Sequence, residues 1–288
     1  MDTPDVSNTE RFKEQVRQEW TSGAAAWRKW NPQFVVQTRA ATDVIVQEAQ
    51  VRPGMQVLDL ASGTGEPALT LAAAVGPGGH VTATDLVPEM LAVAMESARQ
   101  RGLTNITFQQ ADAEALPFPA RTFDVVTCRF GIMFCPNAGQ ALREIHRVLK
   151  PGSRAAFMAW GPFEQQPYFT STIGVFMKYV QLPPPVPGTP HPFAFAKPGT
   201  LSAALHEAGF TQAQEETRTI PWGFLGNVEQ CWEYVRDLGA PAFRRIVEAL
   251  APEKHAQVIS EVLGAIRPYD DGKQVNFPAA VVVATGVR

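Results

Sequence analysis

The segment VLDLASGTGE, from Val57 to Glu66, constrains the fold of this chain more than any other stretch. A short apolar run leads directly into a glycine-rich turn, and the next segment, EPALTLAAAVG, favours a helix. A strand, a glycine turn and a helix in this order are typical of α/β folds whose turn approaches a nucleotide-like ligand. We therefore expect the ligand site to form around this turn.

The alternation of strands and helices continues along the chain. After the first strand, MQVLDLA, the sequence predicts strands at GGHVTATD, ITFQQAD, FDVVTCRF and SRAAFMAW, with helices between several of them. The second of these five strands ends in Asp85 and the third in Asp112. Strands that alternate with helices form crossover units, so the chain is predicted to build an α/β fold with a mostly parallel sheet.

Two regions outside this central alternation follow other patterns. Residues 9–50 are predicted to be helical with a break near Asn31–Pro32, and Trp20, Trp27 and Trp30 share one face of that helix. Core packing is the favoured interpretation of these tryptophans, with ligand contact as the alternative. After residue 160 the sequence predicts a helix over 168–180, a proline-rich loop over 182–193, a helix ended by Gly209, a strand over 212–222, helices over 227–267 and a final strand.

Composition excludes several classes of protein. The 288 residues carry a net charge of −3 without a basic block, so no nucleic-acid partner is expected. The three cysteines, Cys128, Cys135 and Cys231, are too few for a disulfide framework, and the first two lie 135 − 128 = 7 residues apart, which is not a zinc-ligand spacing. The polar N-terminus is no secretory signal, and apolar runs such as Leu69–Val75 are too short to cross a bilayer. A cytoplasmic protein without a metal site or membrane insertion is predicted.

The glycine turn alone leaves two ligand classes open. Residues 63–68 match the fingerprint G-x-G-x-x-A, and Asp85 follows Gly63 by 85 − 63 = 22 residues, where an acid can bind ribose hydroxyls. Nicotinamide enzymes and methyltransferases that use S-adenosylmethionine share this pattern. Asp59, inside the strand, favours the second class, because an acid would repel a pyrophosphate but attract the ammonium and sulfonium of S-adenosylmethionine. The alternative is that Asp59 only caps the turn.

Three further segments complete a family resemblance: QQADAEALPF, LREIHRVLKPGS and a late pair of apolar strands. With them the chain resembles the class I S-adenosylmethionine-dependent methyltransferases, in the branch of the ubiquinone/menaquinone-type C-methyltransferases and many small-molecule methylases. The resemblance runs from about Trp20 to the C-terminus and is most specific over 55–160. It implies one domain over 1–288 with a Rossmann-like, seven-stranded, mostly parallel sheet, helices on both faces and an antiparallel last strand. Within it we expect N-terminal helices over 9–50, a cofactor-binding core over 53–160, helical cap insertions over 161–197 and 223–274, and the final strand over 275–288.

The resemblance also implies the residues that bind S-adenosylmethionine. The turn would surround the methionine portion with Asp59 near its ammonium, Asp85 would hold the ribose, and Asp112 with Ala113 would bind the adenine edge. Ala61 replaces the first glycine of the family's G-x-G-x-G, and its methyl group is expected to tolerate ordinary backbone angles while narrowing the approach of the ligand. The remaining expected contacts are Ser62, Gly63, Thr64 and Gly65 in the turn, Leu86 beside the adenine, Cys128 and Arg129 under the methionine tail, and Trp27 on the N-terminal helix, which closes over the cofactor in many relatives.

The predicted reaction is methyl transfer by in-line displacement, which requires a general base only when the acceptor carries a proton. His191, in the first cap segment, is a weak candidate for that base, and a surface-loop histidine is the favoured alternative. The many aromatic residues of both cap segments predict a small, largely apolar or aromatic acceptor. Two other functions stay open: a nicotinamide-dependent oxidoreductase and a non-catalytic S-adenosylmethionine-binding protein. The sequence identifies neither the acceptor, nor the methylated atom, nor the oligomeric state.

Overall fold

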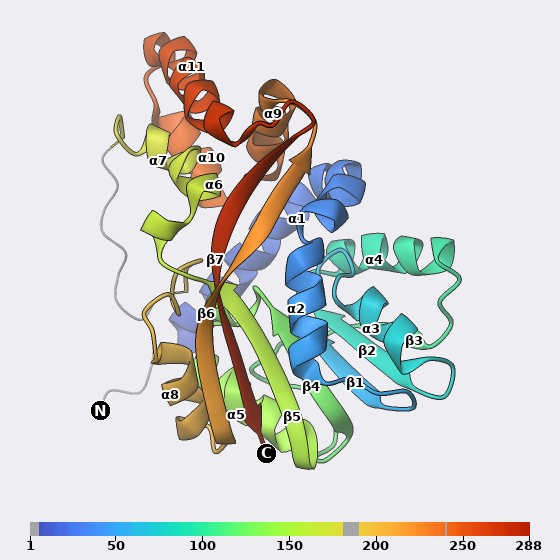
Figure 1. Cartoon of the computed structure of the whole chain (residues 1–288). Coiled ribbons are helices and arrows are strands. Elements are labelled where there is room, and N and C mark those ends of the chain that lie inside the picture. Colours follow the sequence, from blue (N-terminus) through green and yellow to red (C-terminus); the bar gives the residue numbers. More distant parts are fainter. Residues whose placement is uncertain (1–5, 181–189, 240) are drawn as a thin grey trace.

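The computed structural model describes residues 6–180, 190–239 and 241–288 and is centred on one twisted sheet (Figure 1). Among the described residues the sheet has seven strands in the order β3-β2-β1-β4-β5-β7-β6. The pairs β1–β2, β1–β4, β2–β3 and β4–β5 are parallel, and β7 is antiparallel to both β5 and β6. The predicted fold, with its antiparallel last strand, is confirmed. The strands are β1 (Gln56–Leu60), β2 (His80–Asp85), β3 (Ile106–Gln110), β4 (Phe123–Arg129), β5 (Leu149–Trp160), β6 (Thr211–Leu225) and β7 (Gln274–Val287).

Helices cover both faces of this sheet. α2 (Arg39–Ala49) crosses in front of the strands in Figure 1, and α5 (Ala138–Val148) and α8 (Thr200–Glu207) pack together on the opposite face. α3 (Ala68–Val75) and α4 (Pro88–Gln100) follow β1 and β2 as the crossover helices. The centre of the core is apolar on both faces of the sheet, as the near-continuous apolar sequences of β1, β4 and β5 require.

The N-terminal helix differs from its prediction. α1 (Val6–Gln37) continues through Pro32, and the helical segment is interrupted only at Thr38, before α2. A proline removes one backbone hydrogen bond from a helix interior. Here the residues on either side of Pro32 stay helical and pack, with ring centroids of Trp27 and Phe34 4.8 Å apart. The predicted break near Asn31–Pro32 is therefore wrong, because tertiary packing outweighs the local effect of the proline.

The strands β6 and β7 continue beyond the rest of the sheet as a long hairpin. β5 pairs with β7 only over Val281–Val287, whereas β6 pairs with β7 as far as Gln274. Around the projecting part lie α6 (Pro167–Thr170), α7 (Ile173–Phe176), α9 (Val228–Leu238), α10 (Pro241–Ala249) and α11 (His255–Ile266), with the 3₁₀ turns η2 (Phe163–Gln165), η3 (Pro252–Lys254) and η4 (Arg267–Tyr269) (Figure 1). We call this assembly the roof. A further 3₁₀ turn, η1 (Ile132–Phe134), follows β4.

Three boundaries in this part of the chain differ from the predictions. The single helix predicted over 168–180 is two short helices, separated at Thr172, whose backbone angles of φ −115° and ψ −95° are not helical and whose hydroxyl donates to the Tyr168 carbonyl at 2.6 Å. Residues 223–225 belong to β6 rather than to a helical insertion. β3 ends at Gln110, so Asp112 lies two residues beyond the strand. Most of the predicted proline-rich loop, residues 182–189, lies outside the described residues.

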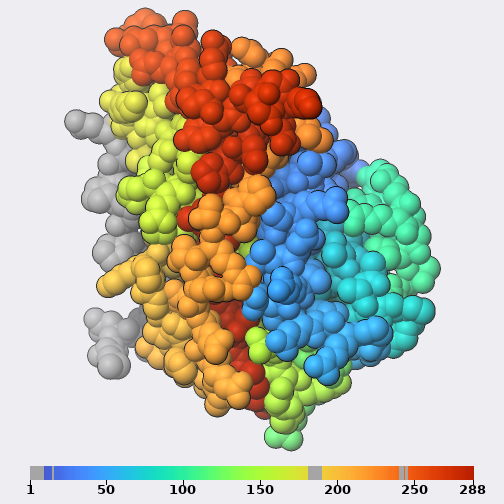
Figure 2. Space-filling view, viewed as in Figure 1, coloured from blue at the N-terminus to red at the C-terminus, as the bar shows by residue number. Residues whose placement is uncertain are grey.

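Segments from the two ends of the chain are neighbours on the face shown in Figure 2, where the blue N-terminal helices lie beside the orange β6. The ion pair between Arg218 of β6 and Glu48 of α2, at 2.6 Å, joins these segments. In the part of the chain that the structure describes, no helix has both the length and the apolar character to cross a membrane. The same residues contain no cluster of three or more His, Cys, Asp or Glu side chains that could hold a metal ion.

Candidate functional site

A cavity of about 590 Å³ lies beyond the carboxyl ends of the parallel strands, where open α/β sheets bind their ligands. Its lining has two chemically different parts, which we call the polar half and the aromatic half. The polar half is formed by the glycine turn and the residues after β2 and β3, with part of α1. The aromatic half is formed by residues at the ends of β4 and β5, by the roof and by β6. The polar half includes Lys13, residues 61–64, 85–87 and 112–114; the aromatic half includes Phe130, Trp160, Tyr168, Phe169, Phe193 and Trp222.

The glycine turn has a left-handed backbone at its first residue. Ala61 has φ = +53°, so the expectation that it keeps ordinary backbone angles is wrong. The methyl group of Ala61 fits because the neighbouring residue in space, Gly131, has no side chain. A Cβ atom on Gly131 would lie 2.4 Å from the Cβ of Ala61. The alanine at position 61 therefore depends on the glycine after β4, a relation that spacing along the sequence did not reveal.

Backbone amides of the turn already have partners inside the protein. The amide of Ser62 donates to Thr84 O at 2.9 Å, and that of Gly65 donates to Ser62 O at 2.8 Å. The amide of Gly63 donates to Asp85 Oδ2 at 2.8 Å, and Pro67, before α3, has no amide proton. A pyrophosphate is usually bound by such amides at a helix N-terminus. This turn therefore fits a dinucleotide poorly, although Ser62, Gly63 and Thr64 line the cavity as predicted.

Asp85 holds two loops together at the edge of the cavity. Besides the amide of Gly63, its carboxylate accepts the amide of Val87 on Oδ1 at 2.9 Å. Burial raises the pKa of this carboxyl, and the two amide donors oppose that shift. Asp85 and Leu86 both line the cavity, where the carboxylate retains acceptor capacity for ribose hydroxyls.

Asp112 is paired with α1. Its Oδ2 lies 2.7 Å from Lys13 Nζ, which also lies 2.9 Å from Glu114 Oε2. Burial alone would lower the pKa of Lys13, but the two carboxylates outweigh burial and raise it. Asp112, Ala113 and Lys13 all line the cavity, so this ion pair closes α1 over the predicted adenine position. No motif marks Lys13, which is one charged residue among many on α1.

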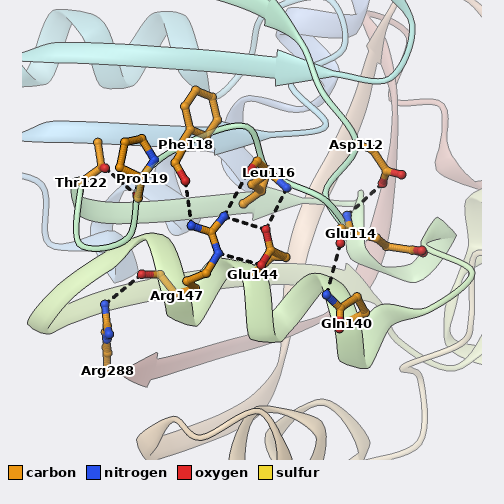
Figure 3. A network of polar contacts seen from close by, with 10 residues as sticks. All are labelled: Asp112, Glu114, Leu116, Phe118, Pro119, Thr122, Gln140, Glu144, Arg147 and Arg288. Carbon is orange, nitrogen blue, oxygen red and sulfur yellow. Dashed lines mark hydrogen bonds and ion pairs between the residues drawn. The ribbon is translucent and has the colours of Figure 1, made fainter.

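The loop that carries Asp112 is fixed to α5 by the network in Figure 3. Arg147 donates to the carbonyls of Phe118 and Leu116 at 2.7 and 2.9 Å, and Glu144 accepts the amide of Leu116 at 2.9 Å. Closer to the cavity, Asp112 Oδ1 accepts the amide of Glu114 at 2.8 Å. The segment LREIHRVLKPGS thus supports the site from outside by holding the loop of Asp112 and Ala113 in place.

Asp59, Gly65 and Cys128 lie behind the cavity wall rather than in it. Asp59 is fully buried, and its Oδ1 accepts the hydroxyl of Thr127 at 2.5 Å. Its Oδ2 has no hydrogen-bond partner among the described residues. Burial raises the pKa of Asp59 from 3.8 to about 7. A buried carboxylate with an unpaired oxygen suits a nearby positive ligand group, as the sequence analysis expected. Cys128 is a core residue whose thiol pKa burial raises to about 12.

Arg129 lines the cavity but is held by the backbone of other elements. Its Nη1 donates to Thr38 O at 3.3 Å and to the hydroxyl of Thr42 at 3.2 Å, and its Nη2 donates to Glu66 O at 2.7 Å. Burial lowers the pKa of this guanidinium to about 10, still well above neutrality. Arg129 therefore ties β4 to α2 and to the glycine turn.

The tryptophans of α1 divide between two roles. Trp20 and Trp27 contact each other, with centroids 5.7 Å apart, and both line the cavity. Trp30 instead packs on Tyr234 at 5.4 Å and donates from Nε1 to Asp237 at 2.9 Å. Core packing describes Trp30, and the placement of Trp20 and Trp27 favours the ligand-contact alternative.

His191 lies at the aromatic half. Its Nδ1 accepts the amide of Phe193 at 3.1 Å, so the neutral ring carries its proton on Nε2. Burial lowers the pKa of His191. With its basic nitrogen occupied, this ring is better placed to donate a hydrogen bond than to remove a proton.

Comparisons with known proteins agree with this geometry. The model of the ubiE/COQ5 methyltransferase family matches residues 24–183, more than half of the chain. Ubiquinone/menaquinone biosynthesis C-methyltransferase UbiE of Shewanella sediminis is 44% identical over 110 residues, which are 38% of this chain and 44% of that protein. UbiE of Shewanella oneidensis is 43% identical over the same length. The chain thus spans less than half the length of these curated relatives.

Solved structures show the same fold. The YcgJ protein of Bacillus subtilis has a TM-score of 0.55 at 20% identity, covering 87% of this chain and 98% of that one. Phosphoethanolamine N-methyltransferase 2 of Haemonchus contortus, solved with S-adenosyl-L-methionine, has a TM-score of 0.54 at 16% identity over 93% and 57% of the two chains. The resemblance to class I S-adenosylmethionine-dependent methyltransferases is confirmed, and the chain belongs to the ubiE/COQ5 methyltransferase family.

Proposed function

We propose that this chain transfers a methyl group from S-adenosylmethionine to a small, largely apolar or aromatic acceptor. The observation that carries this proposal is the single cavity in which a polar half around the glycine turn continues into an aromatic half. Displacement from a sulfonium needs mainly alignment and exclusion of water, because the cofactor supplies a methyl group that is already activated. One cavity with two chemically different walls meets this need.

The polar half has the charge that this cofactor requires. Four carboxylates, those of Glu66, Asp85, Asp112 and Glu114, line it. The two cations of the described lining there, Lys13 and Arg129, are already bound to protein oxygens. The unpaired Oδ2 of Asp59, just behind the turn, fits a cofactor with a positive ammonium group better than one with a pyrophosphate. We propose the turn for the methionine portion, Asp85 for the ribose, and Leu86, Asp112 and Ala113 for the adenine.

The aromatic half supplies rigid apolar walls for the acceptor. Phe130 stacks on Trp160 with centroids 4.3 Å apart, and Trp160 meets Trp222 edge to face at 4.8 Å. Phe169 and Phe193 are a further pair at 5.4 Å. Rings packed this way offer flat surfaces that suit an aromatic acceptor and keep water out. We therefore propose that the segments 161–197 and 223–274, within a single methyltransferase domain over 1–288, serve as the acceptor-binding cap.

The names of the relatives suggest a more specific acceptor. UbiE proteins are described as ubiquinone/menaquinone biosynthesis C-methyltransferases, so we propose a quinone-type ring as the first acceptor to test. The shared segment is less than half of those relatives, and the roof lies mostly outside the region matched by the family model. A cytoplasmic location and the absence of a nucleic-acid partner remain predictions, supported by the sparse cysteines and the net charge of −3.

Two measurements test the proposal. S-adenosylmethionine or its demethylated product should raise the melting temperature, by the equivalent of about 2.7 kcal/mol at 100 times the dissociation constant. NAD and NADP should not. Incorporation of labelled methyl groups is then measured over a panel of quinols, phenols and RNA. Binding of the cofactor without transfer to any small acceptor would favour the non-catalytic alternative, and methylation of RNA would contradict the proposed acceptor class.

A further inference from the structure

We propose that the hydroxyl group of Tyr168 positions the acceptor by hydrogen bonding to an oxygen atom on it, so that the chain selects oxygen-bearing aromatic molecules over plain hydrocarbons. This inference rests on the proposed function and adds to it a recognition group in the aromatic half.

The ring of Tyr168 is held firmly. Tyr168 is the second residue of α6, and its ring centroid lies 5.1 Å from Phe169, 5.8 Å from Phe277 and 6.3 Å from Trp222. Its own carbonyl accepts the hydroxyl of Thr172 at 2.6 Å. Rings from α6, β6 and β7 thus fix the direction of the tyrosine, and the residue lines the cavity.

The hydroxyl of Tyr168 has no hydrogen-bond partner in residues 6–180, 190–239 and 241–288, whereas the neighbouring hydroxyls have one. Tyr234 donates to Gln37 Oε1 at 2.7 Å, and Thr172 donates to a carbonyl. Burial raises the pKa of Tyr168, so at neutral pH the group keeps its proton and remains a donor. A polar group in an apolar wall is unfavourable unless something bonds to it, and a ligand oxygen would satisfy it.

Two more donors in the same half lack an acceptor. Trp222 Nε1 and Gln37 Nε2 are buried without a hydrogen-bond partner in the described part of the chain, although both residues line the cavity. Trp222 is 3% exposed and Gln37 is 2% exposed. Both of these nitrogen atoms are closed to solvent, so a ligand would reach the tyrosine hydroxyl rather than them, and a hydrocarbon ligand would leave that hydroxyl unpaired. An acceptor with oxygen atoms would pair at least the tyrosine hydroxyl, which points to oxygen-bearing molecules.

Contacts between rings place Tyr168 away from the glycine turn. Gly131 is next to Ala61 of the turn, and the adjoining Phe130 contacts Trp222 at 5.9 Å. Tyr168 contacts the same tryptophan, Trp222, so two ring contacts separate Tyr168 from Phe130. A hydrogen bond from Tyr168 would hold the acceptor molecule by the edge that is farther from the glycine turn. The opposite edge of the acceptor would then face the polar half. Tyr168 is therefore a positioning residue rather than a base.

The test uses a matched pair of ligands, 2-naphthol and 2-methylnaphthalene, which differ by a hydroxyl in place of a methyl group. Their affinities for the full chain, saturated with S-adenosylhomocysteine, are measured by isothermal titration calorimetry. Because the methyl group has its own hydrophobic contribution, the readout is the ratio of the two affinities. One neutral hydrogen bond predicts that this ratio favours 2-naphthol roughly three- to tenfold more in the unaltered chain than in Tyr168→Phe. Tyr168→Phe should retain the affinity for 2-methylnaphthalene, which a merely structural role would not do.

Tyr179→Phe is the control, because Tyr179 is bonded to Glu261 and is not part of the cavity lining. It should keep the affinity ratio of the unaltered chain. An affinity ratio that is the same in the unaltered chain and in Tyr168→Phe would overturn the assignment of Tyr168. If S-adenosylhomocysteine binds but neither naphthalene does, the aromatic acceptor itself is wrong and the inference fails with it. Failure of S-adenosylhomocysteine to bind would instead contradict the cofactor part of the proposed function.

Discussion

The two halves of the cavity are organised by different interactions. In the polar half, side chains are fixed by charge and hydrogen bonds: Asp85 by two amides, Asp112 by Lys13 and by an amide. In the aromatic half, rings fix one another by edge-to-face and stacked contacts, and several polar groups have no partner among the residues that the structure describes. A ligand for the first half must match a defined set of bonds, whereas a ligand for the second must mainly match a shape. The difference suggests that the first half determines the cofactor and the second the acceptor.

The largest effect is expected where the halves meet, at Gly131. Gly131→Ala should destabilise the chain by about 3 kcal/mol, because the new methyl group would lie 2.4 Å from the Cβ of Ala61 and 2.8 Å from the sulfur of Cys128. Unfolding in urea measures the loss. In the double variant with Ala61→Gly the first clash is removed, so part of the stability should return. Strictly additive effects of the two substitutions would show that these residues do not meet.

Asp85 tests whether the polar half governs the cofactor. Asp85→Ala should weaken binding of S-adenosylhomocysteine by about 2 kcal/mol, or about 30-fold, because a charged acceptor of hydrogen bonds is removed. Asp124→Ala is the control: Asp124 also accepts a backbone amide, that of Gln56 at 2.9 Å, but outside the cavity. Calorimetry should show a loss of affinity only for the Asp85 variant. Equal affinities of the two variants would remove Asp85 from the site.

The buried carboxyl of Asp59, behind the polar half, should make the stability of the protein depend on pH. Its pKa is raised to about 7 in the folded protein, from 3.8, so the folded state binds the proton more tightly than the unfolded state. Stability should therefore fall as pH rises from about 4 to about 7, by about 3 kcal/mol without cofactor. Asp59→Asn, which stays neutral, should remove this dependence from the urea midpoints. If stability changes equally with pH in the unaltered chain and in Asp59→Asn, the raised pKa of Asp59 is contradicted.

The smallest effect is expected from the ion pairs that hold α1 over the polar half of the cavity. Lys13→Met removes the ion pairs to Asp112 and Glu114, which lie at partly buried positions and are each worth about 1 kcal/mol. Amide hydrogen exchange in the first turns of α1 should become faster, with little change in global stability. Arg17→Met is the control, since its hydrogen bonds go to Glu14 within the same helix. Equal exchange in the two variants would show that Lys13 does not hold α1 down.

The sequence predicted the polar half much better than the aromatic half. Eight of its expected contacts, such as Asp85, Asp112 and the turn, follow from motifs whose strand and helix are adjacent in the chain, and these residues do line the cavity. Asp59, Gly65 and Cys128 do not line the cavity, because motif spacing along the chain does not show which residues of a strand or turn face the cavity and which face the core. Lys13 and Gly131 were missed because their partners are remote: Lys13 meets Asp112 from 99 residues away.

In the aromatic half, composition indicated an apolar pocket but not its arrangement. Phe169 and Phe193, both from the segment 161–197, line the cavity, and so does Trp222 from the predicted strand. The pairing of β6 with β7 determines this, since Trp222 lies opposite Phe277 across the hairpin. Such a contact depends on strand register over a long separation, which local periodicity does not specify.

The part of the β6–β7 hairpin that continues beyond the rest of the sheet has a consequence for how the acceptor pocket could change in evolution. The lower part of the hairpin completes the sheet through β5, while its upper part, from Gln274 to Ala280 of β7, is paired with β6 but not with β5. Mutations in that upper part can alter the pocket without disturbing the strands that carry the cofactor motif. Selection could thus exchange one acceptor for another through substitutions near Trp222 while inheritance preserves the glycine turn. On this view, homologues with the same cofactor site are expected to be most diverse in substrate where the hairpin leaves the sheet.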